Sequence, residues 1–291
     1  MSNPRIEYQL AGTAEPLPPL QGRRILVHLV VNVEHWSFDK PMPRKLLGSP
    51  HGQNNIPDIP NYSWVEYGMR VGLARLLRAL GQRGLPASAS MNASVIEHYR
   101  PAAEAIVAAG WELIGHGMTQ QTLHASPDEK SVIVQTLDTM EAFTGRRPRG
   151  WLGPGLAETM QTPDILSAEG VDYVCDWVID DLPVWLSAQP RPLVALPYTL
   201  ELNDSVLYAA QWYPASEYER RLESTLELFE RECAQHPLVL TVALHPHLIG
   251  VPHRFAAFER MLDRLQASPH TIFVNGSQMC DWFLAARSIS S

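Results

Sequence analysis

The sequence has few cysteines and none of the patterns in which cysteines form a disulfide framework or bind zinc. Only three of its 291 residues are cysteine, at positions 175, 233 and 280. They are odd in number and far apart, and they include no Cys-x-x-Cys pair, which argues against a disulfide scaffold and a thiolate metal site. We expect Cys175, which follows a predicted strand, to be a small buried residue rather than a nucleophile.

Clusters of basic residues and long apolar runs are also missing. The chain has 23 Lys and Arg against 31 Asp and Glu, a net charge of -8 and a pI near 5.8, which gives no electrostatic reason to bind nucleic acid or anionic lipid. No apolar run is long enough to span a bilayer, and residues 1–20 lack the basic start and apolar core of a signal peptide. We therefore expect a cytoplasmic protein without nucleic-acid or membrane partners.

The composition instead favours one large α/β domain. Hydrophobic residues make up 45% of the chain, enough to bury a sizeable core. We expect residues 1–22 to form a Pro-rich leader arm and residues 23–291 to form the domain. Strand-like and helix-like segments alternate along it. The predicted strands are Ile25–Val33, Ala87–Met91, Trp111–Gly115, Gly150–Gly153, Tyr173–Asp176, Val194–Pro197, Leu238–Leu244 and Thr271–Asn275. The predicted helices are Trp64–Gly84, Ser94–Ala109, Pro127–Thr144, Thr162–Glu169, Ser216–His236, His253–Ala267 and Gly276–Arg287.

This rhythm of about seven or eight β/α units predicts a closed or nearly closed parallel barrel, whose active site lies at the carboxyl ends of the strands. The segment 36–62 is rich in Pro, Gly and Asn. We expect it to be an ordered loop over the mouth of the barrel.

Polar and aromatic side chains gather where the predicted strands stop. The run LTVALHPHLIG, for example, carries His245 and His247 to the end of an apolar strand. Polar groups at a buried rim are costly unless a site uses them, so we predict a hydrolase pocket there. The residues at these strand ends are Asn32, Glu34, His116, Asp176, Trp177, Tyr198 and His245.

The motifs NVE, GHG, GWLGP, CDW, PYTLELND and LHPH, in this order on β/α units, resemble those of the NodB-type polysaccharide deacetylase (carbohydrate esterase family 4) superfamily. Within it the chain is most similar to the metal-independent, PuuE-type allantoinases and the cyclic imide hydrolases. The resemblance runs from about Ile25 to Phe283. It implies a distorted (β/α)7 barrel, hydrolysis of a non-peptide C–N bond, and a homo-oligomer such as a tetramer.

The chain departs from the metal-binding pattern of the deacetylases. Where they have two adjacent aspartates, this sequence has Val33 and Glu34, and where their second histidine stands, four residues after His116, it has Gln120. A neutral amide is a poor substitute for imidazole as a zinc ligand. We therefore expect no metal cofactor; the alternative is an irregular zinc site formed by Glu34, His116 and His245.

Without a metal, water must be activated by a general base. We predict that Glu34 is this base, with a pKa raised by burial, and that His245 passes a proton to the leaving nitrogen. His116, between two glycines, is the third predicted catalytic residue. The alternative is that Glu34 pairs with a cation such as Arg70 and that His245 is a hydrogen-bonded core residue.

Ten further residues are predicted to bind the substrate. For Asn203, as for the neighbouring Asp204, a turn-forming role is an equal alternative, and core packing is the default for any single tryptophan. His247 lies near the pocket if the strand continues past Pro246, and outside it if the strand ends there. The ten are Asn32, Tyr62, Trp64, Trp151, Asp176, Trp177, Tyr198, Glu201, Asn203 and His247.

We expect a hydrolase that opens a small cyclic amide, either a cyclic imide or an allantoin-like ureide. One alternative is a polysaccharide or peptidoglycan N-deacetylase. Many polysaccharide deacetylases have an arginine in the motif that GWLGPGL resembles, and its absence here makes this alternative less favourable. The other is a catalytically inactive barrel that binds a small molecule or a protein.

Overall fold

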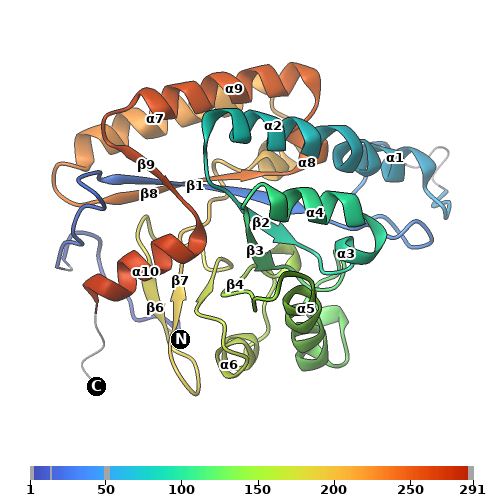
Figure 1. The fold of residues 1–291 in the computed structure, drawn as a ribbon, viewed down its shortest axis with the longest axis horizontal. Helices are drawn as coiled ribbons and strands as arrows, with labels where there is room; N and C mark the ends of the chain where they lie inside the picture. Colours follow the sequence, from blue (N-terminus) through green and yellow to red (C-terminus); the bar gives the residue numbers. More distant parts are fainter. Residues whose placement is uncertain (1–2, 14, 49–52, 288–291) are drawn as a thin grey trace.

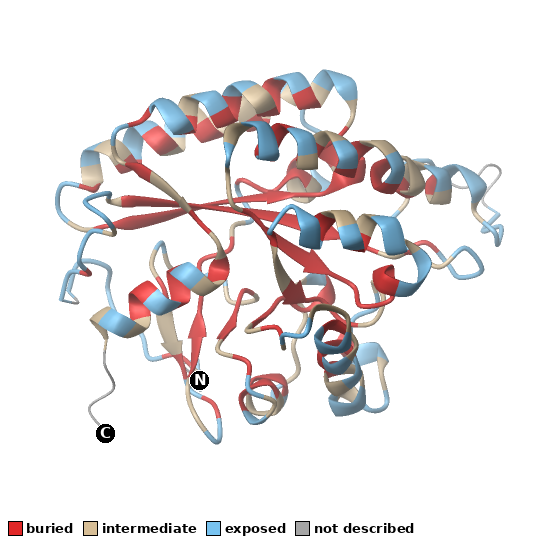
Figure 2. Ribbon diagram, viewed as in Figure 1, coloured by how far each residue is buried: buried red, intermediate tan, exposed pale blue. Residues whose placement is uncertain are grey.

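The two longest strands, β1 (Ile25–Val33) and β8 (Leu238–Leu244), lie side by side in parallel in the computed structural model, which describes residues 3–13, 15–48 and 53–287. Every residue of both strands is buried (Figure 2). A parallel strand covered on both faces needs apolar side chains on both faces, and the near-continuous apolar runs of these two segments meet that need.

Seven parallel strands form a curled sheet in the order β7-β5-β4-β3-β2-β1-β8. At one end β6 pairs antiparallel with β7, and β9 pairs with the first half of β1. The other strands are β2 Ser88–Met91, β3 Glu112–Gly115, β4 Gly150–Trp151, β5 Tyr173–Val174, β6 Val184–Leu186, β7 Leu193–Ala195 and β9 Thr271–Val274.

The chain that follows β7 links the two ends of this sheet. The backbone N–H of Ala243 in β8 donates to Leu202 O (2.9 Å), and Thr241 Oγ1 donates to Pro197 O (2.7 Å). The barrel is therefore closed by an irregular segment instead of a strand pair, which confirms the predicted distorted (β/α)7 barrel.

Helices cover the outside of the sheet, with α7, α9 and α2 above β1 and β8 in Figure 1. The helices are α1 Ile59–Tyr67, η2 Gly68–Gly72, α2 Leu73–Arg83, α3 Val95–His98, α4 Arg100–Ala108, η3 Leu123–Ala125, α5 Glu129–Thr144, η4 Pro154–Leu156, α6 Thr162–Ala168, η5 Ser205–Ala210, α7 Ala215–Glu232, α8 Pro246–Ile249, α9 Pro252–Ala267 and α10 Gly276–Ala286.

Two predicted boundaries are wrong for identifiable reasons. The helix predicted from Trp64 begins at Ile59, because the Asp58 side chain accepts from the backbone N–H of Asn61 and Pro60 suits the first turn. The loop after β1 therefore ends at residue 58, which places Tyr62 on a helix. The helix predicted over Ser94–Ala109 is broken at Tyr99, between α3 and α4.

Described residues of the predicted leader arm pack against the barrel. Ile6 and Leu17 are buried. Arg5 O accepts from the backbone N–H of Ser187, just after β6 (2.8 Å), and Trp282 Nε1 of α10 donates to Pro18 O (2.8 Å). No helix in the described part of the chain is long and apolar enough to cross a membrane.

Candidate active site

Glu34 lies between two histidines at the carboxyl ends of three strands. Its Oε1 is 3.5 Å from His245 Nε2 and 4.0 Å from His116 Nε2. The three side chains follow β1, β8 and β3, and all are buried. Because parallel strands of a barrel end at the same rim, the structure brings the three predicted catalytic residues together.

Asp204 fixes the orientation of His245. Its Oδ1 is 2.6 Å from His245 Nδ1, and its Oδ2 accepts the backbone N–H groups of His245 (2.7 Å) and Ile249 (3.2 Å). This leaves His245 Nε2 pointing at Glu34. Burial lowers the pKa of His245, but the negative charges of Asp204 and Glu34 outweigh it and raise that pKa to about 9.

The predicted rise in the pKa of Glu34 is wrong, because the net shift is downward. Burial acts in the upward direction, but the hydrogen bond and charge of His245, with smaller contributions from His247 and His116, lower the pKa to about 2. Glu34 is therefore a carboxylate paired with a protonated His245 at neutral pH. The alternative partner, Arg70, is exposed on η2.

His116 is held as a neutral ring with one unsatisfied nitrogen. Its Nδ1 donates to Leu152 O (2.5 Å), and burial lowers its pKa, so Nε2 carries a lone pair. This buried Nε2 has no hydrogen-bond partner among the described residues, although the Gln120 side chain approaches the ring. A lone pair beside the Glu34 carboxylate suits a donor such as a water molecule or a substrate N–H.

Trp36 covers Glu34 from the segment that follows β1. Its Nε1 donates to Glu34 Oε2 (2.7 Å), and its ring contacts those of Trp64 and His247, with centroids 6.3 and 5.6 Å away. Trp36, the first residue of the segment 36–62, thus lies directly on the cluster of Glu34, His116 and His245, which we call the Glu34 cluster. Trp36 itself was not among the predicted site residues, although it stands only two positions after Glu34.

His247 remains beside His245 although the strand ends. β8 stops at Leu244 and α8 begins at Pro246, yet the two imidazole centroids are 5.8 Å apart. Burial lowers the pKa of His247 to about 3, and Trp64 Nε1 donates to its backbone carbonyl (3.1 Å).

Two glycines of η2 let the helix backbone touch this segment. A Cβ on Gly72 would lie 2.0 Å from Pro246 O, and one on Gly68 would lie 2.4 Å from the backbone nitrogen of His247. Larger residues at either position would have to push α8 away from the helix. The glycines therefore help to set the position of the chain that carries His245 and His247.

Three other predicted substrate-binding residues, Asn32, Tyr198 and Trp151, are buried. Asn32 Nδ2 donates to Tyr198 Oη (3.0 Å) and to Leu244 O (3.3 Å), and all three residues are buried. Trp151 of β4 is fully buried in the apolar cluster that includes Leu137 of α5 and Leu166 of α6, which is the core-packing alternative. Its Nε1 has no partner in the described part of the chain.

Asp176 and Trp177 follow β5 at the rim. Asp176 Oδ1 accepts the backbone N–H of Gly153 (2.8 Å), and Trp177 Nε1 donates to Glu158 Oε2 (2.9 Å). Both side chains are thus tied to the segment that follows β4.

Three predicted residues are engaged elsewhere. The Glu201 side chain is 81% exposed and pairs with Arg221 (2.6 Å), so the structure does not bring it to the cluster. Asn203 is buried, but its Oδ1 accepts the backbone N–H of Ser205 (3.0 Å), which is the turn-forming alternative. Tyr62 packs its ring edge-on against Phe38, with centroids 4.9 Å apart.

Sequence reasoning also missed Asn92. Its Oδ1 accepts the backbone N–H of His35 (2.9 Å), and its Nδ2 donates to His116 O. It ties the chain after β1 to the chain after β3. Asn92 directly follows β2, so the strand-end pattern that selected Glu34 could have selected it too.

The donor set does not match the usual deacetylase metal site. Among the residues that the structure describes, no group of three or more His, Cys, Asp or Glu side chains is arranged to hold a metal ion. Gln120 occupies the place of the second histidine, and Glu34 Oε2 is engaged by Trp36. We therefore derive no chemical step through a metal.

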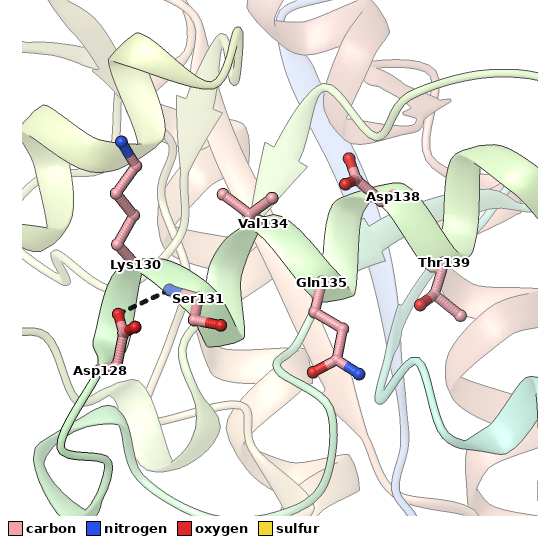
Figure 3. Close-up of a pocket in the computed structure, with 7 residues that line it drawn as sticks. All are labelled: Asp128, Lys130, Ser131, Val134, Gln135, Asp138 and Thr139. Carbon is pink, nitrogen blue, oxygen red and sulfur yellow. Dashed lines mark hydrogen bonds between the residues drawn. The ribbon is translucent and has the colours of Figure 1, made fainter.

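A surface hollow of about 500 Å³ lies elsewhere, along the exposed face of α5 (Figure 3). All the residues that line it come from this helix or its N-cap, and none belongs to the Glu34 cluster. One polar helix face has no convergent catalytic groups, so this hollow is not a candidate active site.

Comparison with known proteins finds a family model and several proteins that resemble part of the chain or its whole fold. Residues 61–174 match the polysaccharide deacetylase family model. A peptidoglycan deacetylase from Helicobacter pylori is 26% identical over 160 residues, which cover 54% of this chain and about half (54%) of that protein.

Two solved structures share the fold over nearly their whole length. A probable polysaccharide deacetylase from Pseudomonas aeruginosa PAO1 is 25% identical, with a TM-score of 0.83 over 96% of this chain and 97% of that one. The PuuE allantoinase is 24% identical, with a TM-score of 0.85 over 98% and 100%. The chain therefore shares its fold with these two structures, and its residues 61–174 resemble a polysaccharide deacetylase domain.

Proposed function

We propose that this protein hydrolyses a C–N bond of a small cyclic amide, a cyclic imide or an allantoin-like ureide. The observation that carries the proposal is the cover over Glu34. Trp36 donates to one carboxylate oxygen, and the Glu34 and His245 side chains are only 5% and 10% exposed. A nearly closed site of this kind suits a ring of five or six atoms, whereas a polymer needs an open groove.

Glu34 is the base in the proposed reaction. Its carboxylate is ionised at neutral pH, and a ring that enters between Glu34 Oε1 and His245 Nε2 separates the two charges. Separation removes the interaction that lowers the pKa of Glu34, so the carboxylate becomes more basic when substrate is bound. It then takes a proton from water as the oxygen of that water bonds to the ring carbonyl carbon.

His245 is the acid. Its protonated Nε2 stabilises the oxyanion that forms on the carbonyl oxygen and then gives its proton to the ring nitrogen as the C–N bond breaks. Asp204 keeps Nδ1 protonated and stabilises the charged ring through the 2.6 Å contact. The proton on Glu34 returns to His245 through solvent, which restores both groups.

His116 positions the reactants. Its unsatisfied Nε2 accepts a hydrogen bond from the attacking water or from a ring N–H. An imide or ureide ring presents such N–H groups beside its carbonyls. The rings of Trp36 and Trp64, which flank His247, supply apolar surface for a flat ring.

A polysaccharide N-deacetylase is the second candidate. It is favoured by the family match over residues 61–174 and by the similarity to a peptidoglycan deacetylase. Both reactions break an amide C–N bond by water attack. The two reactions differ in the shape of site that they need, because a deacetylase has to bind a sugar polymer across an open site.

A single panel of assays separates these candidates. Succinimide, hydantoin, dihydrouracil and allantoin are tested for ring opening, and chitooligosaccharides are tested for release of acetate. We expect turnover of at least one ring and no acetate. Acetate release faster than any ring opening would overturn the proposal, and tight binding of a ring without turnover would identify an inactive binding protein.

A further inference from the structure

A second pair of acidic side chains, Asp176 and Glu158, lies at the same rim but outside the Glu34 cluster. One oxygen of each is satisfied by a fixed donor. Asp176 Oδ1 accepts the backbone N–H of Gly153 (2.8 Å), and Glu158 Oε2 accepts Trp177 Nε1 (2.9 Å).

The other two oxygens lack a donor. Asp176 Oδ2 and Glu158 Oε1 are buried, and neither has an N–H or O–H partner within the described ranges. The two carboxyl groups are close enough for each to shift the pKa of the other. Two carboxylates offer each other only acceptors, so a hydrogen bond can join the two unsatisfied oxygens only when one carboxyl group carries a proton.

The surroundings of the two side chains favour a protonated carboxyl group. Burial raises the pKa of Asp176 well above its usual range, and the charge of Glu158 adds to this effect. Burial also raises the pKa of Glu158, while its hydrogen bonds to Asp176 and Trp177 act in the opposite direction.

The charges that face the pair from neighbouring elements do not neutralise it. Glu129 of α5 further disfavours a second negative charge, and Arg5 of the leader arm acts in the opposite sense. Arg5 is itself engaged by both carboxylate oxygens of Asp164, each at 2.7 Å. The pair therefore carries one negative charge most readily.

The pair is connected to the proposed active site through one stretch of backbone. Asp176 holds the N–H of Gly153, and the preceding residue, Leu152, accepts from His116 Nδ1 (2.5 Å). This hydrogen bond fixes the tautomer that leaves His116 Nε2 as an acceptor. Movement of the Leu152–Gly153 backbone would release it.

We propose that Asp176 and Glu158 share a single proton, and that this carboxyl pair is a positioning device that holds the Leu152–Gly153 backbone on His116. The inference rests on the proposed function only in the role of His116. When the shared proton leaves to solvent at alkaline pH, two facing carboxylates repel each other, the segments after β4 and β5 separate, and His116 loses its fixed tautomer.

One variant of each acidic residue provides a matched test. Glu158→Gln keeps both fixed bonds, because its amide oxygen can still accept from Trp177 Nε1 and its amide N–H can donate to Asp176 Oδ2, but it removes the shared proton. Asp176→Ala breaks the link to Gly153. We expect kcat within about threefold of wild type for Glu158→Gln and a loss of about ten- to a hundredfold for Asp176→Ala, as a small misplacement of a reacting group produces.

Two spectroscopic readouts do not depend on activity. Carboxyl ¹³C spectra of wild type at neutral pH should show one protonated side-chain acid, which is absent from Glu158→Gln. Histidine ¹⁵N spectra should show His116 in one tautomer in wild type and Glu158→Gln, and in a mixture of tautomers in Asp176→Ala. Equal melting temperatures of wild type and Glu158→Gln would confirm that the conservative variant is folded.

The outcomes distinguish this inference from the proposed function. If no ring is opened but both spectra are as expected, the proposed function fails and the carboxyl pair stands. If the ¹³C spectra show both carboxyls ionised at neutral pH, or if His116 keeps one tautomer in Asp176→Ala, the inference is overturned whatever the substrate is.

Discussion

Asp204 Oδ1 lies 2.6 Å from His245 Nδ1, while the Nε2 of the same ring faces Glu34 at 3.5 Å. One imidazole thus stands between two buried carboxylates. This arrangement keeps a proton on each ring nitrogen, raises the pKa of His245 to about 9 and lowers that of Glu34 to about 2. It makes His245 an acid and Glu34 an ionised base at neutral pH.

Replacing Asp204 with Asn should therefore remove the acid while preserving shape. The neutral amide no longer favours a charged ring, so the pKa of His245 should fall and kcat should drop by roughly a hundred- to ten-thousandfold. Histidine NMR titration and steady-state kinetics measure the two effects. Asp138→Asn, at an exposed position on α5, is the control and should change neither.

The pH dependence of activity follows from the same pair. Turnover requires Glu34 ionised and His245 protonated, so activity should persist from weakly acidic pH upward and decline as the pH rises through about 9. A plateau that continues well beyond pH 9 would show that the protonated His245 is not required.

Stability should depend on pH through buried histidines. His28 and His247 have pKa values lowered by burial to about 3, against an ordinary 6.5. Below pH 6.5 the unfolded chain therefore binds protons at these histidines that the folded chain does not bind. Stability should fall as the pH drops below 6.5.

His245 acts in the opposite sense, because its pKa is raised in the folded state. Its contribution to stability is complete below pH 6.5 and is lost as the pH rises through about 9. Urea denaturation across this range should give maximum stability near neutral pH. A protein that is more stable at pH 4 than at pH 7 would contradict the assignment of neutral buried histidines.

The contact between η2 and α8 predicts opposite effects for two Gly→Ala changes. At Gly72 the new Cβ meets Pro246 O, so Gly72→Ala should destabilise the fold by about 1–3 kcal/mol and lower kcat by displacing the segment with His245. At Gly81, an exposed position within α2, a Cβ meets nothing within 4 Å, so Gly81→Ala should stabilise by up to about 1 kcal/mol. Equal changes in stability for Gly72→Ala and Gly81→Ala would show that the close approach of η2 to α8 does not contribute to stability.

Much of the fold could be predicted from the sequence, because long buried strands leave a clear pattern. The predicted strands Ile25–Val33 and Leu238–Leu244 coincide with β1 and β8. β6 was missed, since a strand of three residues gives no reliable periodicity. The helical turns η5 and α8 were also missed, because both follow directly on strands or loops without a helical apolar repeat.

The site could be predicted only in part. Glu34, His116 and His245 were brought together by a topological rule, since parallel strands end at one rim. The partnership of Asp204 with His245 depends on an irregular segment that no local pattern describes. The direction of the pKa shift of Glu34 depends on three surrounding histidines, which cannot be counted before the chain is folded.

Removal of metal provides a further test of the rim chemistry. Because Gln120 stands at the position of a metal-binding histidine, we predict that prolonged chelation leaves activity within a few-fold of that of untreated protein. Elemental analysis of active protein is the direct check. One tightly bound zinc ion per chain, with activity lost on stripping and recovered on re-addition, would instead make Glu34, His116 and His245 its ligands.

The central claim is that Glu34 activates the water that opens the ring, and Glu34→Gln tests it most directly. The amide preserves the size of the side chain but cannot accept a proton from water, so single-turnover ring opening should slow by about a hundred- to ten-thousandfold, with the protein folded and the substrate still bound. Ring opening by Glu34→Gln at a rate within a few-fold of wild type would contradict the account.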